Sequence, residues 1–196
     1  MPTTRRVRTL GADPAAVWRT VGDPHHLPRW WPRVERVEQV DAAGFTELLR
    51  TAKGRATRTI AAAPAAVWKV ASDPLTLPDW WPRVVRVEGV SGRSFTEVLQ
   101  TERGRQVRAD FKVTEQEQGR RRAWSQELEG TPFARMFASV VTEVRLQPQS
   151  PTETKVTIEV RQRLRGVQRL GGFLVSRAAR RNVKAALDGL EELVAG

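Results

Sequence analysis

The stretch "IAAAPAAVWKVASDPLTLPDWWPRVVRVE", residues 60–88, decides how this chain folds. Pro64 suits the first turn of a helix, where its missing N–H costs nothing. Asp73 and Pro74 end that helix and begin another, since Asp is a favoured N-cap and Pro a favoured first residue. Pro78 then keeps the second helix to a turn or two. The predicted elements are helices at 64–72 and 75–81, followed by a strand at 83–90.

The same pattern occurs 50 residues earlier in the chain. "DPAAVWRTVGDPHHLPRWWPRVERVEQV" (13–40) aligns without a gap with "APAAVWKVASDPLTLPDWWPRVVRVEGV" (63–90). The match continues through "FTELLRTAKGR" (45–55) and "FTEVLQTERGR" (95–105). Because a third copy is absent, this is a tandem duplication and not a solenoid. We expect an incomplete repeat at 1–56, in the order strand-helix-helix-strand-strand, and a complete domain at 57–196.

The remaining elements belong to the complete domain. Alternating apolar and polar residues predict further strands, and apolar residues at three- and four-residue spacing predict a long amphipathic helix at the end of the chain. In that helix the basic residues come first and the acidic ones last, which opposes the helix dipole, so tertiary packing must hold it. The predicted ranges are strands at 57–62, 107–114, 139–147 and 154–164, and a helix at 169–194.

The composition excludes several classes of site. The chain has no cysteine, so disulfides, thiolate catalysis and cysteine-based metal sites are excluded. Its two histidines, His25 and His26, are too few ligands for a readable metal site. We expect no metal and no cofactor. No apolar run approaches the ~18 residues of a membrane span, and the N-terminus lacks the apolar segment of a secretory signal. These features favour a cytoplasmic protein.

The net charge of +11 suggests an anionic partner such as nucleic acid or an anionic membrane surface. The charges are nevertheless spread along the chain. The tightest clusters, such as Arg120-Arg121-Arg122, do not alternate with aromatic residues as they do in single-strand-binding grooves. Arginine at every second position, as in Arg161, Arg163 and Arg165, marks the solvent face of a strand. A solvated basic surface is therefore favoured over a nucleic-acid or membrane interface.

The order of strand, two short helices, antiparallel strands and long final helix resembles the START-related superfamily called SRPBCC. This superfamily includes polyketide cyclase/dehydrase-like and lipid-transport proteins. The resemblance rests on residues 60–88, on "GTPFARMF" (130–137) and on the final helix. It covers 57–196 in full and 7–56 as an incomplete copy. It implies an α+β helix-grip fold, in which a curved antiparallel sheet wraps a long C-terminal helix and encloses an apolar cavity that the short helix pair closes.

The tryptophan pair Trp80-Trp81 can be interpreted against that fold. Neighbours on a helix project about 100° apart, so one ring should pack between the short and long helices and the other should lie near the cavity mouth. Packing alone would also explain both rings. The full set of predicted ligand-binding residues, with Glu97 and Gln126 as possible polar handles, is Trp80, Trp81, Phe95, Leu99, Phe111, Trp124, Phe133, Met136, Phe137, Phe173 and Leu174.

These observations favour a protein that binds or carries a small hydrophobic molecule without catalysis. The complete domain has no His, Cys or Tyr, and no pair of carboxylates is forced together by spacing, so we assign no catalytic residue. Two alternatives remain. One is a polyketide cyclase- or dehydratase-like enzyme, and the other is a basic interaction protein that contacts nucleic acid or anionic lipid.

The incomplete repeat retains Trp18, Trp30 and Trp31, which argues that it buries apolar surface. It lacks a long helix of its own. We expect it to pack against the complete domain or against a partner chain, which makes a homo-oligomer through this repeat possible.

Overall fold

The computed structural model describes residues 7–31, 34–42, 44–49, 52–165 and 172–195. The chain forms two compact units, Met1–Arg50 and Thr51–Gly196, and each is described here by itself. No helix in these ranges is both long and apolar enough to cross a membrane.

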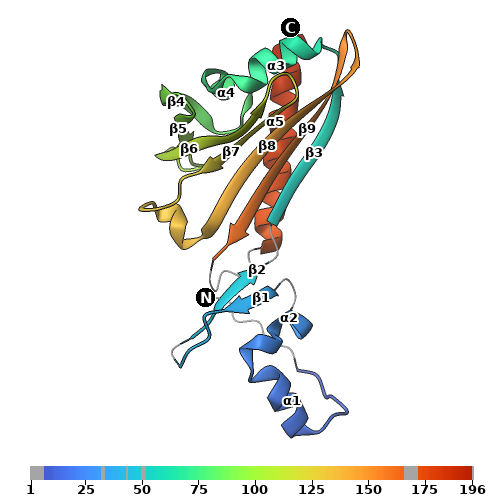
Figure 1. The fold of residues 1–196 in the computed structure, drawn as a ribbon, viewed down its shortest axis with the longest axis vertical. Coiled ribbons are helices and arrows are strands. Elements are labelled where there is room, and N and C mark those ends of the chain that lie inside the picture. The colour runs from blue at the N-terminus through green and yellow to red at the C-terminus, as the bar shows by residue number, and fades with distance from the viewer. Residues whose placement is uncertain (1–6, 32–33, 43, 50–51, 166–171, 196) are drawn as a thin grey trace. The chain divides into compact units, whose positions relative to one another are not determined.

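The N-terminal unit contains the helix pair and hairpin of the incomplete repeat (Figure 1). Its elements are α1 (Pro14–Val21), the 3₁₀ turn η1 (Pro24–His26), α2 (Leu27–Trp30), β1 (Val34–Glu38) and β2 (Thr46–Leu49). The Asp13 side chain caps α1 by accepting hydrogen bonds from the backbone N–H groups of Ala15 and Ala16. The described residues that precede α1 form no strand, contrary to the expected order. The reason is that the equivalent strand of the second unit pairs with a strand for which this unit has no counterpart.

The second unit contains the whole helix-grip arrangement. Its elements are β3 (Ala52–Ile60), α3 (Pro64–Ser72), η2 (Pro74–Thr76), α4 (Leu77–Trp80), β4 (Val84–Ser91), β5 (Ser94–Gln100), β6 (Gln106–Glu117), β7 (Arg121–Gln126), η3 (Pro132–Arg135), β8 (Phe137–Ser150), β9 (Glu153–Leu164) and α5 (Gly172–Ala195). The seven strands form one antiparallel sheet in the order β3-β9-β8-β7-β6-β5-β4. This sheet curves around α5 (Figure 1), which confirms the predicted fold class.

The two copies share one strand register. In the N-terminal unit Val34 pairs with Leu49, and in the second unit Val84 pairs with Leu99. In both hairpins the pairing register shifts between this valine and the arginine two residues after it. Because the same residues give the same pairing in both places, the local structure of this segment is encoded within the repeated sequence itself.

One short motif adopts different structures in the two copies. "TERGR" (101–105) forms the turn between β5 and β6, where Gly104 has a positive φ of 75°. In the first copy the corresponding residues from Ala52 onward begin β3, which pairs with β9 as far as Gln162. The strand expected at 57–62 therefore starts earlier, at Ala52, because β9 is long enough to pair with these additional residues.

Two glycines allow α5 to lie close to its neighbours. A Cβ added to Gly54 of β3 would lie 2.4 Å from the carbonyl carbon of Ala179 in α5. A Cβ added to Gly189 of α5 would lie 2.8 Å from the carbonyl oxygen of Trp80 in α4. Real Cβ atoms do not approach this closely, so any larger residue at either position would push the helix away.

The C-terminal end of α5 is held by an ion pair with the sheet. Arg58 of β3 donates a hydrogen bond of 2.6 Å from Nη1 to Glu191 and also pairs with Asp188. These contacts supply the tertiary support that the unfavourable charge order of the helix requires.

The outer face of the sheet carries a cluster of charges around Glu143. Its carboxylate is 2% exposed and accepts hydrogen bonds from Arg121 of β7, Arg145 of β8 and Arg161 of β9. Burial tends to raise the pKa of Glu143, but hydrogen bonds from Arg145 and Arg121 outweigh it, and the net pKa is lowered. Part of the arginine excess is thus used to hold three neighbouring strands together.

Candidate functional site

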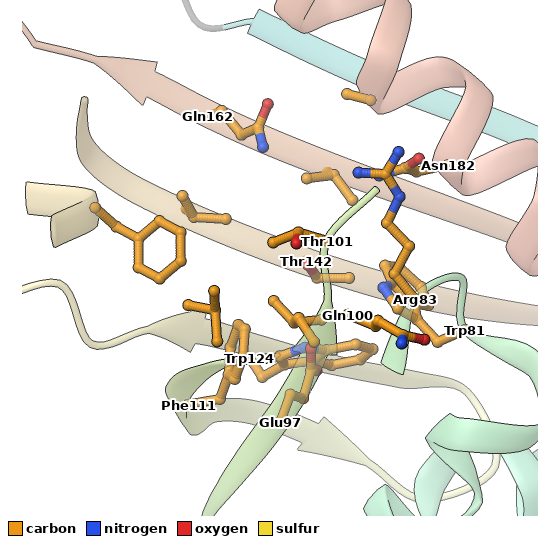
Figure 2. Close-up of a pocket in the computed structure, with 16 residues that line it drawn as sticks. Trp81, Arg83, Glu97, Gln100, Thr101, Phe111, Trp124, Thr142, Gln162 and Asn182 are labelled. Carbon is orange, nitrogen blue, oxygen red and sulfur yellow. The ribbon is translucent and has the colours of Figure 1, made fainter. Parts of the chain in front are cut away.

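A cavity of about 310 Å³ lies between the inner face of the sheet and α5 (Figure 2). Its walls come from β5 to β9, from α5 and from the residues that follow α4. The apolar part combines the aromatic rings of Trp81, Phe111, Trp124 and Phe133 with aliphatic side chains such as Leu99 and Val160. A largely apolar hollow with a few polar groups is typical of a small-molecule site.

The aromatic residues form a connected wall. The ring centroids of Trp81 and Trp124 are 6.0 Å apart, and those of Phe95 and Trp124 are 6.5 Å apart. Phe95 also stacks on Phe111 at 5.5 Å. Because these rings come from β5, β6, β7 and the segment after α4, they fix the shape of the cavity across four separate parts of the chain.

The adjacent tryptophans have different surroundings. Trp80 is buried in the core, and its backbone touches α5 at Gly189. Trp81 follows the helix in extended backbone conformation and lines the cavity. Their rings meet edge to face at 5.4 Å. The ring of Trp81 is thereby supported from behind by a core residue, while a ligand contact of Trp81 stays a prediction.

Glu97 of β5 carries the carboxyl group among the described residues that line the cavity. The residue is 3% exposed, and burial raises the pKa of its carboxyl group to about 8. It lies on the same face of β5 as Phe95 and Leu99, because side chains alternate along a strand. At neutral pH the cavity therefore contains an uncharged carboxylic acid, which is able to donate a hydrogen bond.

Two arginines lie beside this site, Arg83 in its lining and Arg122 against the ring of Trp124, with no hydrogen-bond partner for Arg122 Nε among the described residues. Arg83 is one of the residues that line the cavity, and its backbone has a positive φ of 69°. Its guanidinium donates a hydrogen bond of 2.6 Å to Glu102. Arg122 is buried, with its guanidinium 5.9 Å from the Trp124 ring centroid. Burial lowers the pKa of Arg122, and the charge of Asp73 partly opposes this effect.

Polar groups on the other side of the cavity come from β8, β9 and α5. Figure 2 shows Gln162 and Asn182 across the cavity from Glu97, and Thr142 also contributes to the lining. The Oε1 atom of Gln162 has no hydrogen-bond partner among the described residues. Sequence reasoning missed these three, although the arginines at 161, 163 and 165 on the solvent face already imply that Gln162 points inward.

The structure places five of the predicted ligand-binding residues in the cavity wall: Trp81, Leu99, Phe111, Trp124 and Phe133. Trp80 and Phe95 are core residues behind it, and Phe137 packs partly buried against that core. Gln126 lines a separate hollow beside Leu128. No ligand contact of any of these residues is tested by the fold.

Two predicted residues lie elsewhere, and one lies outside the described set. Met136 is exposed just beyond η3. Leu174 is 63% exposed because it is nine residues before the buried Val183, which places it on the opposite side of the helix at about 100° per residue. The side chain of Phe173, and residues 169–171 of the predicted helix, lie outside the described part of the chain.

In the described part of the chain no three acidic or histidine side chains come close enough together to hold a metal ion. The polar groups among the described lining residues are Glu97, Arg83 and amide and hydroxyl side chains, set beside the aromatic wall.

Comparison with known sequences finds one family profile that matches the chain in two places. The profile of a family described as "Polyketide cyclase / dehydrase and lipid transport" matches residues 1–56 and again 51–195. Among proteins with curated functions, none matches the chain.

Solved structures of low sequence identity share the fold. A START superfamily protein from Mycobacterium smegmatis superposes with a TM-score of 0.61 at 13% identity, covering 72% of this chain and 96% of its own. The Zhui aromatase/cyclase from Streptomyces sp. R1128 gives a TM-score of 0.61 at 19% identity, covering 74% of this chain and 94% of its own. At these identities the likeness extends to the fold alone.

Proposed function

Because the chain belongs to the polyketide cyclase/dehydrase and lipid-transport family, we propose that its cavity binds a small, largely hydrophobic molecule. The observation that supports this proposal is the cavity of about 310 Å³ between the sheet and α5, with its aromatic wall. A void of that size inside a close-packed protein leaves apolar side chains without contacts. A ligand of matching size would restore those contacts.

Titration with the uncharged fluorescent probe N-phenyl-1-naphthylamine tests the proposal. We expect saturable binding with blue-shifted emission, and little response to added salt. Val160→Phe fills part of the cavity and is expected to reduce binding, whereas Leu174→Phe alters an exposed position and should leave it unchanged. Circular dichroism and melting temperature check that both variants fold. Probe binding that Val160→Phe does not reduce would place the probe elsewhere and contradict the proposal.

A cyclase- or dehydratase-like reaction is the second candidate, and the observation that favours it is Glu97. A carboxyl group with a pKa of about 8 inside an apolar cavity can act as a general acid near neutral pH. Incubation with a linear poly-β-ketone substrate and analysis of the products by mass spectrometry tests this candidate. Turnover that Glu97→Gln abolishes while binding persists would support the enzyme, and binding without turnover would support the carrier.

A further inference from the structure

Glu97 is a buried polar group whose partner is missing from the protein itself. Its carboxyl group makes no hydrogen bond or ion pair with any of the residues that the structure describes, although the residue is only 3% exposed. Its neighbours on the same face of β5 are Phe95 and Leu99, and its cross-strand partner on β6 is Ala109. Because Glu97 lines the open space of the cavity, a molecule that occupies the cavity can become its hydrogen-bond partner.

Neither of the two arginines beside the cavity holds Glu97 as a carboxylate. Arg83 lies in the same lining but pairs with Glu102. Arg122 occupies a separate small space beside Asp73 and stacks on the aromatic wall. Burial alone accounts for the raised pKa of Glu97, so no arginine holds it as a carboxylate. Below about pH 8 it offers an O–H donor.

The same features disfavour charged ligands. An ammonium group would need an ionised Glu97 and a free aromatic face, yet the guanidinium of Arg122 already lies 5.9 Å from the Trp124 centroid. The net charge of +11 also repels cations. Among the described residues that line the cavity the cation is Arg83, and the Nη2 atom of its guanidinium already donates to Glu102, which disfavours an anionic ligand.

We propose that Glu97 selects an uncharged, largely apolar carbonyl compound by donating a hydrogen bond to its oxygen. This inference rests on the proposed function of the cavity and adds the chemical class of its ligand. On the far side, the unpartnered Oε1 of Gln162 is placed to accept a hydrogen bond from a hydroxyl group of the same molecule. A hydroxylated ketone would therefore satisfy both groups.

Three tricyclic probes of nearly equal size test the class. Fluorene has no polar group, fluorenone carries a carbonyl group, and 9-aminofluorene carries an amine. At about pH 6 we expect the wild-type protein to bind fluorenone about tenfold more tightly than fluorene, as one hydrogen bond to a buried donor predicts. At about pH 10 Glu97 is ionised, and the preference for the ketone should disappear because a carboxylate cannot donate.

Two variants and one control identify the residue responsible. Glu97→Gln keeps an N–H donor without titrating, so the ketone preference should persist at both pH values. Glu97→Leu removes the donor and should bind both probes about equally. Glu127→Gln changes an exposed acid outside the cavity and should behave as wild type. Equilibrium dialysis measures all affinities, and melting temperatures confirm folding.

The outcomes separate this inference from the proposed function. If none of the three probes binds, the cavity is not a hydrophobic ligand site and both proposals fail. If fluorene and fluorenone bind equally well at about pH 6, the cavity binds apolar molecules but Glu97 does not select carbonyl compounds. Tightest binding of 9-aminofluorene would show that the site takes a cation, which also overturns the inference.

Discussion

Gly189 of α5 and Trp80 of α4 touch backbone to backbone, since a Cβ on the glycine would lie 2.8 Å from the tryptophan carbonyl oxygen. In an open helix, Gly→Ala stabilises by up to about 1 kcal/mol. Here we expect Gly189→Ala to destabilise by about 1–3 kcal/mol, because the added methyl forces the helices apart.

Urea denaturation followed by circular dichroism measures the change in the free energy of unfolding. The sign of that change tests the prediction. Ala185→Gly, at an exposed position of the same helix, is the control and should cost about 1 kcal/mol through helix propensity alone. A stabilising Gly189→Ala would mean that α4 and α5 are not in close contact.

The duplication supplies a matched pair of tryptophans. Trp68 is 6% exposed in α3, whereas its equivalent Trp18 in α1 is 73% exposed. Trp68→Ala should therefore lower the free energy of unfolding by about 3–5 kcal/mol. Trp18→Ala should change it by less than about 0.5 kcal/mol. Guanidinium denaturation compares the two. A comparable loss from Trp18→Ala would show that Trp18 is covered in solution, as the expected packing of the incomplete repeat requires.

Glu97 should make the protein less stable as the pH rises. Its pKa is about 8 when folded, against a usual value of 4.5, so the folded state binds the extra proton. The stabilising contribution is fully present below about pH 4.5 and is lost progressively up to about pH 8. Each unit of pKa difference corresponds to about 1.4 kcal/mol, so the total loss is several kcal/mol.

Glu97→Gln isolates this contribution from other titrating groups. We expect the free energy of unfolding of the variant, relative to wild type, to increase between about pH 5 and 8 and then to level off. Denaturation curves at several pH values measure it. Parallel pH profiles for the two proteins would show that the carboxyl group is ionised or solvated in the folded state.

Glu143 should have the opposite pH dependence. Its pKa is lowered, because hydrogen bonds from Arg145 and Arg121 outweigh the effect of burial. The stability that it contributes is therefore present above its unfolded pKa and is lost as the pH falls through the lowered folded value.

Glu143→Gln leaves the arginines around this position without their anion, and we expect a loss of about 3–5 kcal/mol at neutral pH. Glu117→Gln is the matched control on the same sheet, because the Glu117–Arg120 pair is exposed and should contribute less than about 1 kcal/mol. Thermal unfolding of both variants provides the comparison. Equal losses would indicate that the Glu143 cluster is solvated.

The order of elements could be predicted because it depends on local signals. Pro64 begins α3, Asp73 accepts a hydrogen bond from the N–H of Leu75 at the start of η2, and the apolar stripe of α5 contains Val183 and Leu187. Each of these signals acts within a few residues of its own position. The order of the predicted helices and strands along the chain indicated the superfamily and the antiparallel sheet around the final helix.

The polar side of the cavity depends on contacts between distant segments. Phe95 and Leu99, two residues to either side of Glu97, indicate the inward face of the strand and made Glu97 a candidate polar handle. The extent of its burial could not be predicted, because it depends on Phe111, Trp124 and the strands that carry them. Arg122 follows two other arginines and reads as part of a basic surface, yet it is buried against Phe95 and Trp124. Such residues are identified by tertiary structure and not by periodicity.

The common register of the two hairpins also bears on how this chain could change length. Val34 and Leu49 pair as Val84 and Leu99 do, and Glu47 stands where Glu97 does. A crossover that joins equivalent positions of the two copies would delete one repeat while leaving a single hybrid hairpin with every cross-strand partner and the cavity carboxyl group in place. The same deletion would put Thr4 of the first copy where Gly54 packs against Ala179, so α5 would have to move before the shortened chain could close its cavity.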